Sequence, residues 1–262
     1  MTLKVHSYES MGTYDGPGLR LVVFLQGCPF RCLYCANPDT IPYEGGTETD
    51  ITEILQMAIR QKPFFGKRGG VTFSGGEPTL QTKALIPLVE QLHENGINVC
   101  LDSNGGIWNS DVEKLLSLTD LVLLDVKEFN PQRHEALTGR SNSQTLRTAA
   151  WLQEHGKPFW LRYVLVPGYS DYEEDIRALG EHFGNLATSA DRNSGAEESA
   201  GQDNGYSMIQ KVEILPYHTL GINKYEALGQ EYKLKNVPLN TKEQLQRAEK
   251  LFKEYFSCVV TN

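Results

Sequence analysis

The sequence predicts an α/β fold of the β/α-barrel kind, in which six strands alternate with helices along a chain of 262 residues. Two observations support this prediction. Short apolar, β-rich runs alternate with segments whose apolar residues recur at helical spacing. Polar or charged residues directly follow the apolar runs. Such alternation produces parallel strands joined by right-handed crossovers, and in a β/α barrel the carboxyl ends of the strands carry the active site.

Each expected strand is an apolar run flanked by turn or polar residues. The run from Leu21 to Gln26 (LVVFLQ) is the first, and the run from Leu121 to Val126 (LVLLDV) is almost continuously apolar. Continuous apolar runs are typical of parallel strands that are buried on both faces. We expect strands at residues 21–26, 70–73, 97–101, 121–126, 158–166 and 212–215.

The expected helices lie between these strands, and one follows the last of them. Asp50 precedes the first helix and suits an N-cap, because its side chain can accept a backbone hydrogen bond. Pro87 lies inside the second helix and predicts a late start or a kink, since proline lacks the amide hydrogen. We expect helices at residues 51–59, 85–92, 111–118, 145–155, 172–183 and 241–256.

Composition excludes several classes of function. The net charge is −8 and no dense Lys/Arg stripe is present, so nucleic acid is not expected as a partner. Residues 1–10 hold no long apolar run, and no run of about 18 apolar residues occurs, so we expect neither a signal peptide nor a membrane span. We expect one cytoplasmic, monomeric domain over residues 1–262, with the polar residues 188–207 as a flexible insertion.

Three cysteines are clustered at Cys28, Cys32 and Cys35, and no fourth cysteine is close in sequence. A [4Fe–4S] cluster is usually held by four cysteines, so three ligands would leave one iron open to a substrate or cofactor. Zinc bound by three thiolates and a distant histidine is the alternative, and the spacing alone leaves both open. We expect the remaining two, Cys100 and Cys258, to be buried as small apolar side chains.

Two motifs taken together resemble the radical S-adenosylmethionine (SAM) superfamily. One is the Cys28-x3-Cys32-x2-Cys35 motif with the aromatic Tyr34 before its last cysteine, and the other is the turn at residues 75–78 (GGEP). Within this superfamily, residues 12–20 (GTYDGPGLR) and 24–28 (FLQGC) resemble the glycyl-radical-enzyme activases. The segments most similar to those activases that act on pyruvate formate-lyase are residues 101–105, 121–127, 162–164 and 215–218.

The resemblance implies a fold, two cofactors and a reaction. The fold is a partial (β/α)6 TIM-like barrel of the radical SAM type, in agreement with the strand count. Three thiolates hold a [4Fe–4S] cluster, SAM binds the open iron, and a flavodoxin- or ferredoxin-type donor supplies one electron. Cleavage of SAM then leads to a glycyl radical on pyruvate formate-lyase. A different glycyl radical enzyme as the partner is the alternative, and a non-catalytic zinc protein is the alternative from another class.

The resemblance also assigns roles residue by residue. The three clustered cysteines are the ligands of the catalytic cluster, and Asp15 positions the glycine loop of the substrate or orients a reacting group. Residues expected at SAM are Tyr34, Cys35, Ala36, Gly75, Gly76, Glu77, Asp125, Val126, Lys127, Arg162 and His218. Residues expected at a monovalent cation, Na⁺ or K⁺, are Asp102, Ser103, Leu123 and Asp125.

One position departs from the family pattern. Ala36 follows the third cysteine, where the family often has histidine. A contact to SAM through the backbone tolerates alanine, whereas a contact through the histidine side chain would be lost. The resemblance implies that Ala36, like Tyr34, contacts SAM through its backbone, and the effect of alanine in place of histidine stays open.

Overall fold

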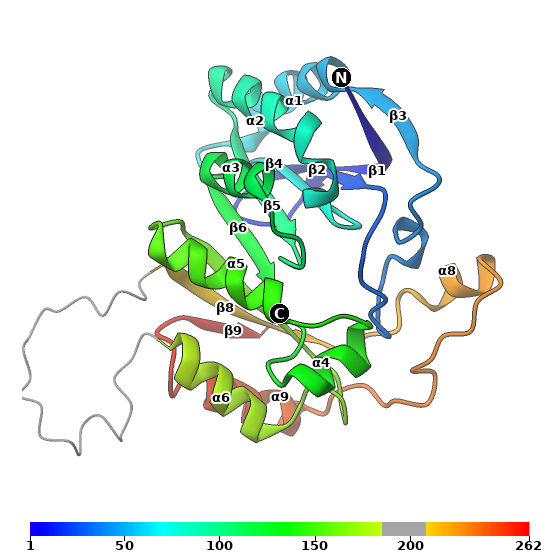
Figure 1. Ribbon diagram of the computed structural model, residues 1–262, viewed down its shortest axis with the longest axis vertical. Coiled ribbons are helices and arrows are strands. Elements are labelled where there is room, and N and C mark those ends of the chain that lie inside the picture. The colour runs from blue at the N-terminus through cyan, green and yellow to red at the C-terminus, as the bar shows by residue number, and fades with distance from the viewer. Residues whose placement is uncertain (185–207, 262) are drawn as a thin grey trace, which may run out of the picture.

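The computed structural model describes residues 1–184 and 208–261. Its strands are β1 (Thr2–Gly12), β2 (Arg20–Leu25), β3 (Thr47–Asp50), β4 (Gly70–Gly75), β5 (Asn98–Ser103), β6 (Leu121–Asp125), β7 (Phe159–Leu165), β8 (Ile209–Pro216) and β9 (Val259–Thr261). They form one sheet in the order β3-β1-β2-β4-β5-β6-β7-β8-β9 (Figure 1). The six predicted strands are confirmed as β2 and β4 to β8, and each neighbouring pair among them is parallel.

The helices lie around the outside of the curved sheet (Figure 1). They are α1 (Ile51–Phe65), α2 (Thr82–Glu94), α3 (Ser110–Leu118), α4 (Pro131–Thr138), α5 (Ser143–Glu154), α6 (Glu173–Phe183), α8 (Ile222–Ala227) and α9 (Lys242–Phe252), with the 3-10 turns η1 (Pro38–Thr40) and η2 (Pro78–Gln81). All five residues of β6 are buried, which accounts for its continuous apolar run. No helix in the described part of the chain is both long and apolar enough to cross a membrane.

Two local predictions about helices had opposite outcomes. The side chain of Asp50 accepts a hydrogen bond from the amide of Thr52, so the predicted N-cap of α1 is confirmed. The prediction that α2 starts late was wrong, because the helix begins at Thr82 and continues through Pro87. Burial of Leu85 and Val89 on either side stabilises the helix there. Proline therefore removes one backbone hydrogen bond without ending this helix.

The sequence patterns missed several elements. Strands β1 and β3 pair antiparallel at one edge of the sheet, and β9 adds a parallel strand at the other. Helices α4 and α8 were also missed, and they are only 8 and 6 residues long. Cys100 is buried as expected, but Cys258 is exposed, because it lies in the loop just before the edge strand β9. The insertion predicted at residues 188–207 lies outside the described residues.

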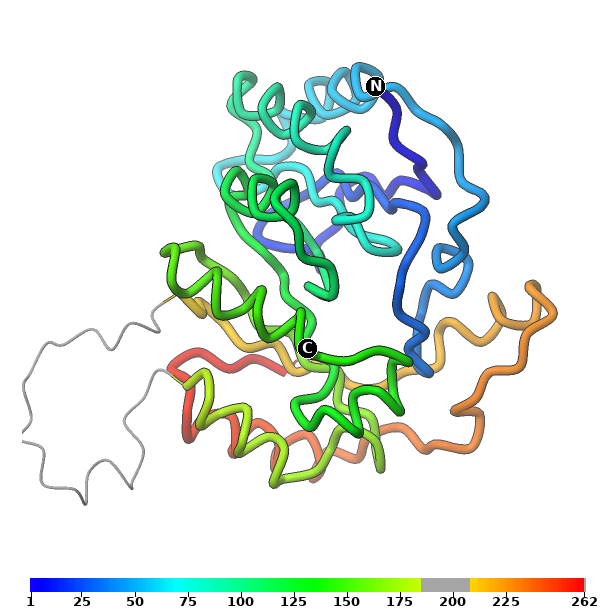
Figure 2. Tube along the Cα trace, viewed as in Figure 1, coloured from blue at the N-terminus to red at the C-terminus, as the bar shows by residue number. Residues whose placement is uncertain are grey.

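The segment that carries the three cysteines is enclosed by parts of the chain that are distant in sequence. It leaves the end of β2 and passes beside the segment that carries α8 (Figure 2). There Lys224 of α8 donates hydrogen bonds to Asn37 and Asp39, at 2.9 and 3.1 Å. Gly221 lies so close that an added Cβ atom would be 3.0 Å from the carbonyl oxygen of Cys35. The cysteine segment is therefore packed from both its own end of the sheet and the C-terminal part of the chain.

Candidate active site

A cavity of about 350 Å³ lies at the carboxyl ends of the parallel strands. It brings together most of the predicted site residues, namely Cys28, Cys32, Tyr34, Cys35, Ala36, Gly75, Gly76, Asp102, Ser103, Asp125, Lys127, Arg162 and His218. The predicted residues Asp15, Glu77, Leu123 and Val126 are not among those that line it. Lining residues to which the sequence assigned no role are Phe30, Asn37, Thr40, Ile41, Ser74, Asn104, Val164, Leu215, Pro216 and Tyr217.

The lining residues that the sequence analysis missed differ in how easily the sequence could have revealed them. Many of them lie within two residues of a predicted site residue, as Ser74 does beside Gly75 and Tyr217 beside His218. Proximity to a motif could have found these. Thr40 and Ile41 lie farther along the cysteine segment and reach the cavity because their carbonyl groups bind the amides of Gly27 and Cys28. These two hydrogen bonds are evident only in the three-dimensional structure.

The cysteine segment is held by backbone hydrogen bonds on two sides. The amide of Cys28 donates to the carbonyl of Ile41 at 3.1 Å. On the other side, the amides of Arg31 and Leu33 donate to the carbonyls at the end of α4, at 2.8 and 3.0 Å. Helix α4, which was not among the predicted helices, is therefore part of the frame that positions the cysteines.

Burial controls the protonation of the three thiols. It raises the pKa of Cys28 and of Cys32 to about 12, and it also raises the pKa of Cys35. The charge of Lys127 opposes the rise at all three positions. The free thiols are therefore protonated at neutral pH, and a metal has to displace their protons when it binds.

The arrangement of the cysteines is compatible with an iron–sulfur cluster. Zinc requires its ligand atoms to converge on one point at about 2.0–2.3 Å. No three His, Cys, Asp or Glu side chains in the described part of the chain are placed to share one ion in this way. In a [4Fe–4S] cluster each cysteine binds a different iron, so the three cysteines need only line one cavity, as they do here.

The turn at Gly75 and Gly76 packs directly on the strand that leads to the cysteines. A Cβ atom at Gly76 would lie 2.1 Å from the carbonyl oxygen of Gly27, and one at Gly75 would lie 2.5 Å from the amide nitrogen of Leu25. Gly75 also has a φ of +101°, which favours glycine. Both glycines line the cavity, so the missing side chains leave backbone exposed to a ligand.

Glu77 has a different placement from its two glycine neighbours. Its carboxylate is fully buried and accepts hydrogen bonds from the amide and hydroxyl of Thr79, the hydroxyl of Ser103 and the amide of Asn104, at 2.6–3.0 Å. Burial raises the pKa of Glu77, and these hydrogen bonds oppose the rise. The carboxylate thus joins the turn after β4 to the end of β5.

Two buried carboxylates and two cations line the deeper wall of the cavity. Arg162 lies between Asp125 and Asp102, at 2.9 and 3.0 Å, and Lys127 donates to Asp125 at 2.5 Å. Burial would raise the pKa of Asp125, but Arg162 and Lys127 outweigh it and lower the pKa to about 2. Burial raises the pKa of Asp102, which Arg162 opposes. The hydroxyl of Ser74 also donates to Asp102, at 2.7 Å.

The other predicted residues surround this wall. Asp15 lies outside the cavity lining, where its carbonyl accepts a 2.7 Å hydrogen bond from the hydroxyl of Thr72. Burial, with a contribution from Asp102, raises the pKa of Asp15 to about 6. Leu123 and Val126 are buried in and just after β6.

Aromatic and imidazole groups complete the cavity on the side of the cysteine segment. Tyr34 is buried with its ring 5.7 Å from the ammonium nitrogen of Lys127. His218, after β8, lines the cavity from an exposed position. The cavity therefore combines buried charges at its base with an accessible rim.

The sequence pattern of the Radical SAM superfamily matches residues 22–180, which is more than half of the chain. The chain belongs to this superfamily. It is 42% identical over 255 residues to the pyruvate formate-lyase-activating enzyme of Streptococcus mutans, covering 94% of this chain and 89% of the relative. It is 38% identical over 255 residues to the pyruvate formate-lyase 1-activating enzyme of Escherichia coli, covering 96% of both. The chain is thus a member of the pyruvate formate-lyase-activating enzyme family.

Solved structures agree with this fold. The structure of Streptococcus suis SuiB bound to S-adenosylmethionine matches with a TM-score of 0.67 and 14% identity, over 94% of this chain and 50% of that one. A domain of a pyruvate-formate lyase-activating enzyme from Bacteroides vulgatus matches with a TM-score of 0.56 and 20% identity, over 74% of this chain and 99% of that one. At these identities the likeness concerns the fold alone.

Proposed function

We propose that the chain generates a glycyl radical on pyruvate formate-lyase, using a [4Fe–4S] cluster and SAM. The observation that carries this proposal is the convergence of three cysteines and the Gly75-Gly76 turn on one cavity at the carboxyl ends of the strands. The names of the curated relatives point to the same partner. The cluster and SAM supply a one-electron cleavage that produces a radical able to take a hydrogen atom from a glycine.

The residues of the chain hold and orient these groups. Cys28, Cys32 and Cys35 bind the cluster, each by its sulfur. The exposed backbone of Gly75 and Gly76 binds the ammonium group of SAM through carbonyl oxygens. Close backbone packing, described above, fixes the position of that turn relative to the cysteines and so supports this assignment.

The charged wall of the cavity suits the carboxylate and adenosyl parts of SAM. Lys127 and Arg162 are the cations that face the cavity there and bind the carboxylate. Tyr34, Ala36 and Val126 act through their backbone, and His218 lies at the rim beside the adenosyl group. Glu77 supports the turn through its hydrogen bonds to Ser103 and Asn104.

A monovalent cation completes the proposed site. Asp102 and Asp125 supply two carboxylates, and the hydroxyl of Ser103 and the carbonyl of Leu123 supply further oxygen atoms. Before SAM binds, Arg162 bridges the two carboxylates and Lys127 pairs with Asp125. When Arg162 turns towards SAM, Na⁺ or K⁺ takes over its role. The test is the affinity for SAM, which should be higher in Na⁺ or K⁺ than in a bulky organic cation.

The remaining assignments concern partners. The electron donor is a flavodoxin- or ferredoxin-type protein, Asp15 meets the glycine loop of the lyase, and the activase acts as a cytoplasmic monomer. The alternative is the same chemistry on a different glycyl radical enzyme. Assays of activation against two such enzymes in parallel distinguish the two partners.

Anaerobic reconstitution with iron and sulfide tests the proposal. The reduced protein should give the electron paramagnetic resonance (EPR) signal of a [4Fe–4S] cluster, and the signal should change when SAM is added. Pyruvate formate-lyase incubated with the loaded protein should then acquire a glycyl radical. The variant C32S should lose both signals, whereas C258S, at an exposed cysteine outside the cavity, should retain them. A loaded protein that leaves the lyase without a radical contradicts the proposal.

A further inference from the structure

Asn104 directs a buried amide group at the first cysteine. It follows β5, is 7% exposed and lines the cavity. Its Nδ2 donates a hydrogen bond to the Sγ atom of Cys28 across 3.6 Å. No role assigned above uses this contact. A buried side-chain donor to a metal-ligating sulfur is the kind of group that tunes an iron–sulfur cluster.

The direction of this amide is fixed by its other contacts. Its Oδ1 accepts a 2.8 Å hydrogen bond from the amide of Gly106, which leaves Nδ2 on the side of the sulfur. The backbone amide of Asn104 donates to Glu77 at 2.8 Å, and its carbonyl accepts from the hydroxyl of Thr145 at 2.7 Å. Asn104 is therefore held at three points besides Cys28 before any ligand binds, so the donor is preorganised.

A buried negative charge near Cys28 makes a hydrogen-bond donor to its sulfur important. The buried carboxylate of Glu77 is one hydrogen-bonded residue away from Cys28, because Asn104 bonds to both. A negative charge at that place opposes further negative charge on the sulfur. The side-chain amide of Asn104 acts in the opposite direction through its hydrogen bond to the sulfur, while the backbone amide of the same residue binds Glu77. Glu77 thus holds in place the donor that offsets its own charge.

On the basis of the function proposed above, we propose that Asn104 is a positioning residue that raises the reduction potential of the cluster through its hydrogen bond to Cys28. One electron enters the cluster from a reductant such as dithionite or a reduced flavodoxin-type protein, and no proton leaves Asn104. The added electron increases the negative charge on the sulfur ligands, so the hydrogen bond stabilises the reduced state more than the oxidised state.

The test is a potentiometric titration of the reconstituted protein, without SAM, followed by EPR. Two variants remove the donor: N104L has a similar size, and N104D retains the acceptor for the amide of Gly106. The matched control is T145V, which removes a different hydrogen bond to the same residue and leaves its amide group in place. Iron content and the EPR line shape establish in each case that a [4Fe–4S] cluster is present.

At a fixed potential near the wild-type midpoint, we expect the ratio of reduced to oxidised cluster to fall about threefold to tenfold in N104L and N104D. T145V should keep the wild-type ratio. An exchangeable-proton coupling of the reduced wild-type cluster should also disappear in N104L. Loaded N104L with a wild-type midpoint would overturn the inference, as would an equal shift in T145V or the failure of both Asn104 variants to hold iron. If the wild-type protein forms no [4Fe–4S] cluster, the proposed function itself has failed.

Discussion

The guanidinium group of Arg162 donates from Nε to the buried carboxylate of Asp125 across 2.9 Å. A second nitrogen of the same group lies 3.0 Å from Asp102, so one guanidinium bridges two carboxylates that are each only 12–13% exposed. Lys127 pairs with Asp125 as well and supplies the second positive charge. The three residues come from three adjacent parallel strands, β5, β6 and β7. The base of the cavity is therefore an ionic contact that joins neighbouring strands.

Replacement of Arg162 should destabilise the fold. The variant R162Q leaves Asp102 without its ion-pair partner and Asp125 with Lys127 alone. Removal of one partner from a buried ion pair costs about 3–5 kcal/mol. Chemical unfolding at pH 7 measures this cost. The control R177Q breaks the exposed pair of Arg177 with Glu254 and should cost less than about 1 kcal/mol. Equal unfolding free energies for the two variants would contradict this account.

Glu128 should make the stability depend on pH. Burial raises its pKa from 4.5 to about 7. Between these values the folded protein holds a proton that the unfolded chain releases, so the folded state binds more protons and its stability falls as the pH rises from about 4.5 to about 7.

The variant E128Q removes this titration. The difference in unfolding free energy between E128Q and wild type should be about 1–3 kcal/mol larger at pH 8 than at pH 5, so the variant gains stability relative to wild type as the pH rises. Urea unfolding at the two pH values measures the difference. E154Q, at an exposed glutamate of α5, should follow the wild-type pH dependence. A pH dependence unchanged in E128Q would show that this carboxyl is ionised in the folded protein.

Substitution of Gly76 should push the Gly75-Gly76 turn away from the backbone at Gly27, just before the cysteine segment. In G76A the new methyl group would lie 2.1 Å from the carbonyl oxygen of Gly27, so the backbones have to move apart, at a cost of about 1–3 kcal/mol. The iron content after reconstitution should also fall. G156A is the control, because nothing lies within 4 Å of an added Cβ atom there and only its positive φ is unfavourable. Full iron content in G76A would argue against this contact as a determinant of the site.

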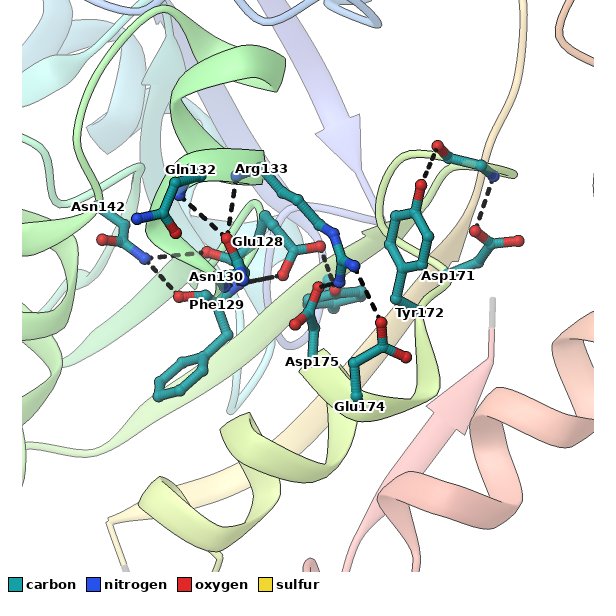
Figure 3. A network of polar contacts seen from close by, with 12 residues as sticks. Glu128, Phe129, Asn130, Gln132, Arg133, Asn142, Asp171, Tyr172, Glu174 and Asp175 are labelled. Atoms are coloured by element: carbon teal, nitrogen blue, oxygen red, sulfur yellow. Dashed lines mark hydrogen bonds and ion pairs between the residues drawn. The ribbon is translucent and has the colours of Figure 1, made fainter.

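The link between α4 and α6 should control how firmly the cluster is held. Arg133 of α4 forms ion pairs with Asp175 and Glu174 of α6, and its guanidinium lies 3.7 Å from the centre of the Tyr172 ring (Figure 3). Because the end of α4 binds the backbone of the cysteine segment, D175N should accelerate iron loss to a chelator severalfold. E174Q, at a residue that is 65% exposed, should have little effect. Equal rates for the two variants would argue against a link through the buried partner.

The features that the sequence predicted correctly are those that produce a local pattern of residues. Apolar runs located the six parallel strands, and the cysteine spacing with the Gly75-Gly76 turn located one wall of the cavity. The contact of Asn104 with Cys28 joins residues 76 positions apart, and no local pattern reports such a distance. The same holds for Arg133 and Asp175, which are 42 positions apart.

Other omissions had a local signal. Helix α4 begins at Pro131, and the side chain of Asn130 caps it by accepting hydrogen bonds from two amides. An asparagine followed by proline is a recognised helix start. The apolar content of this helix is low, so hydrophobic periodicity alone did not reveal it. Strand β3 (TETD) is similarly polar because it lies at the edge of the sheet.

That edge position has a consequence for the behaviour of the protein at high concentration. An open sheet offers unpaired backbone groups at both of its ends, and such edges are where neighbouring molecules add strands and aggregate. Here the sheet ends in β3, which has four residues with Glu48 exposed among them, and in β9, which has three. At these two strands an incoming strand would find only a short template, and at β3 that template also carries a charge. The sheet can thus remain open around its cavity with little tendency to polymerise.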